Sequence, residues 1–161
     1  MSAEFNENEL PIVERAERYC AQGEQCRSGI RAKLSSWGAT PQLADRVVNH
    51  LCKQGFIDEH RYVLYYADNK LRNQKWGRLK ISYQLRSKQL SRDLIDEALR
   101  SIDPQVYHDV LTELAKTKLQ TLTGLDERQT TTKLTSFLLT KGFEGPDVQT
   151  VVNEVLHPEN K

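Results

Sequence analysis

The residues best suited to binding chemistry lie in one basic stretch, residues 69–92, which contains no acidic residue. Its eight cationic side chains are Lys70, Arg72, Lys75, Arg78, Lys80, Arg86, Lys88 and Arg92. Trp76 and Tyr83 interleave with them. Lysine and arginine beside aromatic rings suit contacts with phosphates and stacked bases, or with an acidic groove on a protein. The candidate partner- or DNA-binding residues are therefore Arg72, Lys75, Trp76, Arg78, Lys80, Arg86, Lys88 and Arg92.

A purely structural origin of this basic stretch stays open. Lys70, Arg72 and Lys75 would lie near the end of a helix, where cations are favourable because the last carbonyl groups carry partial negative charge. On an ideal helix the basic residues that follow point to several sides, so they form no single stripe.

Residue patterns for catalysis or metal binding are absent from the sequence. The four histidines form no HExxH motif and no pair four residues apart. No glycine-rich phosphate loop or nucleophile elbow is present. The three cysteines, Cys20, Cys26 and Cys52, form no CxxC motif, and their odd number favours reduced thiols. We expect no enzyme activity, no cofactor and no bound metal.

The composition is that of a folded, nearly neutral chain. The 161 residues include 23 Lys and Arg against 22 Asp and Glu, a net charge of +1. This balance excludes a disordered polyelectrolyte and a uniformly basic packaging protein. No apolar run approaches the roughly 20 residues of a membrane span, and the start is acidic. We expect a cytoplasmic monomer without a membrane segment.

The spacing of apolar residues predicts an all-α fold. Apolar residues recur every three or four positions almost everywhere, and no segment alternates as a strand would. Prolines fall at the ends of these segments, as in Thr40-Pro41 and Asp103-Pro104, which predict a helix N-cap followed by the first helical residue.

An internal repeat emerges when Gly38, Gln89 and Gly142 are aligned, at spacings of 51 and 53 residues. A leucine lies four residues before each, and apolar residues recur eight before and nine, ten and thirteen after. Each unit reads as a leading helix, a helix that ends in a turn, and a further helix. We therefore expect three tandem three-helix repeats in an elongated, curved body.

The expected divisions follow from this register. Residues 1–9 are expected to form a flexible N-terminal tail and residues 157–161 a C-terminal tail. The repeats are expected at 10–56, 57–102 and 103–156.

Two segments resemble the RecX family, the regulators of the RecA recombinase. They are residues 57–62, IDEHRY, and residues 76–88, WGRLKISYQLRSK. The family pattern there is an acidic-acidic-x-Arg-Tyr-Ala helix start, then a Gly-x-x-x-Ile-x-x-x-Leu helix. The resemblance covers about residues 12–156. It departs from the pattern at Val63, where the family has alanine, at Leu79, where a basic or small residue is common, and at Gln89, where it usually has glycine.

The resemblance implies a non-catalytic regulator in DNA repair, recombination and the SOS response. Proteins of this family bind the RecA–DNA filament in its groove and inhibit its strand-exchange, ATPase and co-protease activities. Single- or double-stranded DNA is a second expected partner. A combined charge reversal of Arg78, Arg86 and Lys88 is predicted to abolish inhibition without unfolding the helices.

Two other interpretations stay open. The first is a helical repeat protein that binds DNA without a recombinase partner, which predicts tight, salt-dependent binding to DNA alone. The second is an interaction scaffold for an unrelated protein. Trp37, just before Gly38, is either a lid on a helix end or an exposed contact.

Overall fold

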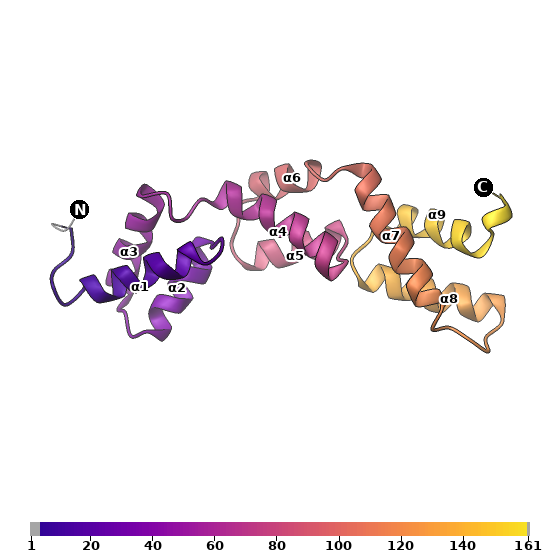
Figure 1. Ribbon diagram of the computed structural model, residues 1–161, viewed down its shortest axis with the longest axis horizontal. Coiled ribbons are helices and arrows are strands. Elements are labelled where there is room, and N and C mark those ends of the chain that lie inside the picture. The colour runs from indigo at the N-terminus through magenta and orange to yellow at the C-terminus, as the bar shows by residue number, and fades with distance from the viewer. Residues whose placement is uncertain (1–3, 161) are drawn as a thin grey trace.

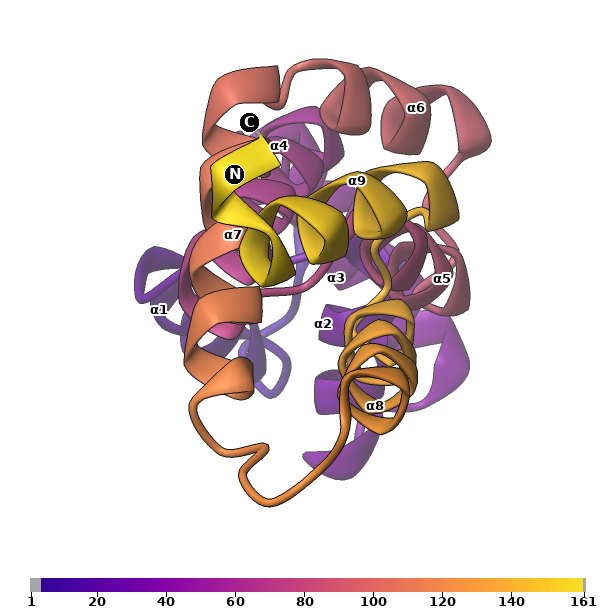
Figure 2. The same cartoon turned by 90° about the vertical axis from the view of Figure 1, so that its right-hand side faces the viewer.

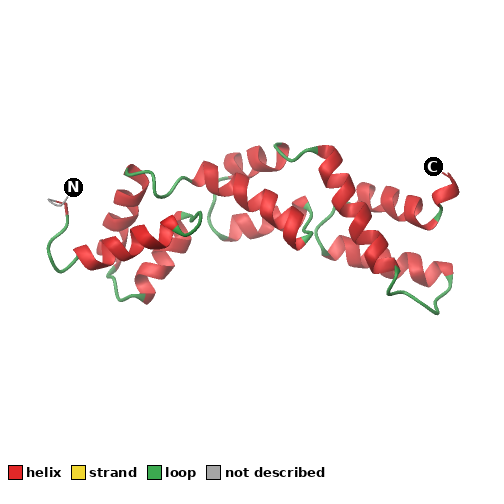
Figure 3. Ribbon diagram, in the orientation of Figure 1, coloured by secondary structure: helices red, strands yellow, loops and turns green. Residues whose placement is uncertain are grey.

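The computed structural model describes residues 4–160, which are helical and contain no strand (Figures 1 and 3). The elements are α1 (Leu10–Ala21), α2 (Arg27–Ser36), α3 (Pro41–Lys53), α4 (Glu59–Gln74), α5 (Arg78–Ser87), α6 (Arg92–Arg100), α7 (Pro104–Leu119), α8 (Glu127–Thr140), α9 (Gly145–Leu156) and the 3-10 turn η2 (Pro158–Asn160). The predicted all-α fold is confirmed. No helix in the described range is long and apolar enough to cross a bilayer.

The helices form three bundles placed end to end in an elongated, gently curved body (Figure 1). Each bundle contains a leading helix (α1, α4 or α7), a second helix (α2, α5 or α8) and a third helix (α3, α6 or α9). The two termini lie at opposite ends of the body.

Capping side chains fix where helices begin. The Thr40 hydroxyl accepts a hydrogen bond from the backbone N–H of Leu43 at 3.2 Å, and Pro41 follows as the first helical residue. The Asp103 carboxylate accepts from the N–H of Gln105 at 2.8 Å in the same way. These caps pair N–H groups that a helix start leaves unbonded, as the sequence predicted.

The three second helices end alike. Each is followed by a residue with positive φ: Gly38 at 95°, Gln89 at 66° and Gly142 at 97°. The left-handed conformation turns the chain toward the third helix, and glycine adopts it without a steric penalty. The aligned positions of the sequence repeat are therefore equivalent in the structure.

The second helices also bury equivalent apolar pairs, spaced four residues apart. All six side chains are completely buried: Ile30 and Leu34, Ile81 and Leu85, Leu134 and Leu138. The first bundle has a core of its own, whereas the cores of the second and third bundles are continuous. Cys26 extends from the first bundle into that second core.

The contact between the second and third bundles, here the second joint, is made by backbone. The N–H of Gly77 donates to the carbonyl of Lys141 at 2.9 Å, and the N–H of Leu79 donates to the carbonyl of Gly142 at 2.9 Å. A side chain at either glycine would collide with the facing segment. Glycine is therefore required on both sides of this joint.

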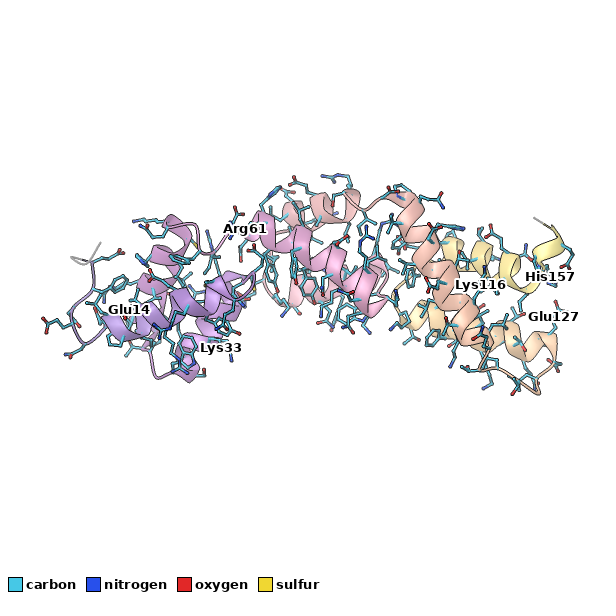
Figure 4. The ribbon with its side chains drawn as sticks, in the orientation of Figure 1. Glu14, Lys33, Arg61, Lys116, Glu127 and His157 are labelled. Carbon is cyan, nitrogen blue, oxygen red and sulfur yellow. The ribbon has the colours of Figure 1, made fainter. Side chains whose placement is uncertain are left out.

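The contact between the first and second bundles, here the first joint, is more polar. The Ser28 hydroxyl donates to the carbonyl of Lys88 at 2.6 Å, and Arg61 pairs with Glu24 at 2.7 Å. Arg61 lies where the two bundles meet (Figure 4). Both joints set the end of one second helix against the start of another. As a result, α8, α5 and α2 follow one another along one side of the body (Figure 1).

The N-terminal segment corrects one expectation. Residues 1–9 were expected to be a flexible tail, but Phe5 is only 5% exposed and belongs to the first core. Arg46 donates to both carboxylate oxygens of Glu9, at 2.9 and 3.0 Å, and to the carbonyl of Glu4 at 2.8 Å. Burial of an aromatic ring and a bidentate ion pair hold this segment on α3. Residues 1–3 lie outside the described range.

At the other end, residues 157–160 also make contacts in place of the expected tail. His157 pairs with Glu127 at 2.9 Å, which ties the end of α9 to the start of α8 (Figure 4). Residues 158–160 form η2. Residue 161 lies outside the described range.

Candidate partner-binding surface

The candidate residues lie in two groups at the ends of α5 and the adjoining ends of α4 and α6. Arg72, Lys75, Trp76, Arg78 and Lys80 form the group near its start, and Arg86, Lys88 and Arg92 form the group near its end. At a rise of 1.5 Å per residue, the nearest members of the two groups, Lys80 and Arg86, lie roughly 9 Å apart along α5. The structure does not gather them into one cluster.

Trp76 is the centre of the first group. Its half-buried ring lies between the amines of Lys70 and Lys80, which are 4.9 and 4.7 Å from the ring centroid. Lys75 has a positive φ of 58°, and its amine donates to the carbonyl of Arg72 at 2.8 Å. Cations over an aromatic face are attracted to its negative potential, so the ring orients two amines at the surface.

Arg78 makes structural contacts at the second joint. Its guanidinium pairs with Glu144 at 3.1 Å and lies 3.8 Å from the ring centroid of Tyr107. The Tyr107 hydroxyl accepts from the N–H of Arg78 at 2.9 Å and donates to Glu144. Burial, and then the hydrogen bond to Glu144, raises the pKa of Tyr107. Because these groups satisfy one another, Arg78 is a structural residue first and a binding candidate second.

Two other candidates also have acidic neighbours. Arg72 pairs with Asp68 at 2.7 Å, and Arg92 lies 3.8 Å from Asp96. Both acids flank the acid-free stretch in the sequence and approach it because they are four residues away on the same helix. Among residues 4–160, no ion pair involves the four remaining basic candidates, which are Lys75, Lys80, Arg86 and Lys88.

The second group is built around a shallow pocket of about 590 Å³ between α5 and α6. Arg86 and Arg92 both line it, together with Ser82 and Asp96. The neighbouring Lys88 places its amine 6.0 Å from the ring centroid of Tyr66. This end of α5 therefore offers two arginines that an anion could bridge.

Sequence reasoning missed the basic residues of the outer second helices. Arg27 and Lys33 on α2, and Arg128 and Lys133 on α8, are exposed. Figure 4 shows Lys33 on the lower side of the body, along which the second helices run. Together with two basic residues of α5, these residues are here called the basic side: Arg27, Lys33, Lys80, Arg86, Arg128 and Lys133.

Charge is segregated between the helices of the repeats. The second helices contain a single acidic residue, Glu127, whereas the third helices contain six. Aligning the repeats on their second helices would have revealed this pattern, because α2 and α5 both lack acids.

Two lysines lie close together where the basic side crosses the second joint. Burial lowers the pKa of Lys141, and the charge of Lys80 lowers it further. The Lys141 amine donates to the carbonyl of Gln74 at 3.0 Å, and the Lys80 amine lies over the ring of Trp76.

Trp37 acts as a lid on the first bundle. Its half-buried ring packs against the first core, with the ring of Tyr19 edge-on at 5.9 Å between centroids. The guanidinium of Arg15 covers it at 4.1 Å. The structure therefore favours the lid interpretation over an exposed contact.

Comparison with known proteins agrees with this architecture. Residues 58–99 match the family model described as RecX, second three-helix domain. The chain is 33% identical over 129 residues to the regulatory protein RecX of Clostridium tetani, covering 79% of this chain and 59% of that protein. It is 27% identical over 158 residues to the regulatory protein RecX of Clostridium acetobutylicum, covering 96% and 73%.

The fold is also found in solved structures. A crystal structure of regulatory protein RecX superposes with a TM-score of 0.81 at 24% identity, covering 91% of this chain and 72% of that one. The matched part spans about three-fifths of the Clostridium tetani protein, as the 59% coverage shows. The middle bundle matches the family model of the second three-helix domain, and the relatives align across most of the chain. On these grounds the chain belongs to the RecX family.

Proposed function

We propose that this chain is a non-catalytic regulator that binds the RecA–DNA filament in its helical groove and inhibits the strand-exchange, ATPase and co-protease activities of RecA. Its relatives carry the name of regulatory proteins. The observation that carries the proposal is that the second helix of each bundle has exposed basic residues and almost no acidic ones.

The shape of the chain suits a long groove. The second helices have 10, 10 and 14 residues, and together they extend over roughly 50 Å at 1.5 Å per residue. Basic side chains along that length can meet phosphates or carboxylates at several points. Many weak contacts on one body give high affinity only for a partner that presents negative charges at matching positions.

The test is the ATPase of the cognate RecA on single-stranded DNA, titrated with the wild-type chain and with a variant carrying Lys33→Glu, Arg86→Glu and Lys133→Glu. The variant changes one exposed residue on each second helix. We expect the wild type to inhibit at amounts well below one per RecA monomer. The variant should need about tenfold more chain or worse, because three favourable contacts become repulsive.

The matched control carries Lys53→Glu, Arg100→Glu and Lys116→Glu. These residues are also exposed, one in each bundle, and none lies on a second helix. The control changes the net charge equally, so inhibition equal to that of the wild type would assign the effect to the basic side. An equal loss of inhibition in both variants would mean that inhibition depends only on net charge, which would contradict the proposal.

Binding to DNA alone is measured at the same salt concentration. Inhibition that appears only when the DNA is saturated would favour a plain DNA-binding repeat protein over a filament regulator. Weak DNA binding together with strong inhibition would support a regulator of the RecA–DNA filament.

A further inference from the structure

The outward face of α5 carries a row of three exposed side chains, here the α5 stripe: Leu79, Tyr83 and Arg86. They are four and then three residues apart, so they lie on one face of the helix, opposite the buried Ile81 and Leu85. Leu79 is 57% exposed and Tyr83 is 64% exposed. Within residues 4–160, the other exposed large hydrophobic residues are Tyr65, at 57%, and Leu139, at 45%.

The α5 stripe is held in a fixed position. The N–H of Leu79 donates to the carbonyl of Gly142 at 2.9 Å, so the start of α5 is bonded to the third bundle. Ile81 and Leu85 anchor the other side of the helix in the core. A preorganised surface loses little conformational entropy on binding, which favours a contact that a partner can use.

The chemistry of the stripe points to a protein. Tyrosine and arginine are the residues that most often dominate protein interfaces. A leucine gains nothing from a phosphate backbone, whereas it gains free energy by burial against an apolar protein surface. A stacked base would use Tyr83 but would leave Leu79 exposed.

The positive charge around the α5 stripe indicates that the partner surface is acidic at its edges. Residues 69–92 contain no acid, and Lys80 and Arg86 flank the two hydrophobic side chains on α5. We propose that the α5 stripe is a protein-docking site for an apolar patch with acidic residues around it on RecA. This assignment rests on the proposed function. In it, the α5 stripe contacts the RecA protein, while the other residues of the basic side bind the DNA.

The test uses the full chain with Leu79→Ala and Tyr83→Ala combined. Two binding partners are compared by fluorescence anisotropy: RecA without DNA, and an oligodeoxythymidine of about 30 nucleotides without RecA. We expect the affinity for RecA to fall by about tenfold or more, because two central apolar contacts are lost. The affinity for the oligonucleotide should stay within about twofold.

Tyr65→Ala is the matched control, because Tyr65 is 57% exposed on α4 and lies outside the stripe. It should bind RecA and the oligonucleotide as the wild type does. Both stripe positions are exposed, so urea unfolding of the double variant should match that of the wild type. An unfolding midpoint that shifts in the double variant would make the stripe a structural feature and overturn the proposal.

The outcomes separate this inference from the proposed function. A parallel loss of oligonucleotide binding would make the stripe a base-stacking surface, and unchanged RecA affinity would leave it without a role; either overturns the assignment while wild-type inhibition still stands. A wild-type chain that neither binds RecA nor inhibits its ATPase overturns both proposals.

Discussion

The backbone of Gly77 lies directly against the backbone of Gly142, 65 positions further along the chain, and this contact joins the second and third bundles end to end. A Cβ atom at position 77 would fall inside van der Waals contact with the carbonyl group of Gly142 and the amide nitrogen of Phe143. These are backbone atoms and cannot rotate away. The joint therefore tolerates no side chain at this point.

Gly77→Ala should lower the free energy of unfolding by about 1–3 kcal/mol, the usual cost of overpacking. Gly23→Ala is the control, because a Cβ atom there meets nothing within 4 Å. Urea unfolding monitored by circular dichroism measures both. Equal unfolding midpoints for the two variants would mean that the close backbone contact at the joint does not contribute to stability.

Arg78 should behave differently from the basic residues around it. Arg78→Ala removes a half-buried ion pair with Glu144 and a cation–π contact with Tyr107. We expect a loss of about 1–3 kcal/mol in the free energy of unfolding, because Glu144 loses a charged partner. Arg72→Ala should cost much less, because its ion pair with Asp68, one helical turn away, is exposed and screened by water and salt.

This difference changes how the binding surface is tested. A charge reversal that includes Arg78 would disturb the second joint, so lost inhibition could reflect a misplaced third bundle. Arg86 has no such role in the described chain and is the better probe. If Arg78→Ala proved as stable as Arg72→Ala, Arg78 would return to the set of free binding residues.

The sequence was sufficient for the repeat and for the helix starts at Thr40 and Asp103, because both depend on local spacing. Buried pairs such as Ile81 and Leu85 follow from a period of 3.6 residues. The partner of Arg78 could not be predicted, since Glu144 is 66 residues away and approaches only through the second joint. Phe5 was assigned to a tail because one aromatic residue among polar ones shows no periodic pattern. In the structure its ring is buried in the first core, against α3.

Gln89 occupies a position that favours glycine. Its φ of 66° is left-handed, whereas the equivalent turns of the other two bundles use Gly38 and Gly142. Gln89→Gly should raise the free energy of unfolding by up to about 1 kcal/mol, since relief of the strained backbone outweighs the added freedom of the unfolded chain.

The reciprocal change tests the same reasoning. A Cβ atom at position 38 meets nothing within 4 Å, so the main cost of Gly38→Gln comes from its left-handed conformation. We expect a loss of about 1–2 kcal/mol. Thermal or urea unfolding of the two variants should shift in opposite directions, and a shift in the same direction would show that the turn residue is not what distinguishes them.

The contact between His60 and Glu97 should make the second bundle sensitive to pH. His60 Nε2 lies 2.7 Å from Glu97 Oε1 and ties the start of α4 to α6. The hydrogen bond to Glu97, and then its charge, raises the pKa of His60 above its ordinary value. A raised pKa in the folded state means that protonation stabilises the fold. This stabilisation is complete below the unfolded pKa of about 6.5 and is lost as the pH rises through the folded pKa.

His60→Gln should therefore destabilise the chain more at about pH 5.5 than at about pH 8.5. The difference in the free energy of unfolding between wild type and variant, measured by urea titration at both pH values, checks this. Glu97→Gln should remove the same pH dependence, because the imidazolium ion then lacks its carboxylate. A difference that is flat with pH, or larger at the higher pH, would mean that Glu97 does not raise the pKa of His60 in the folded chain, and would contradict this prediction.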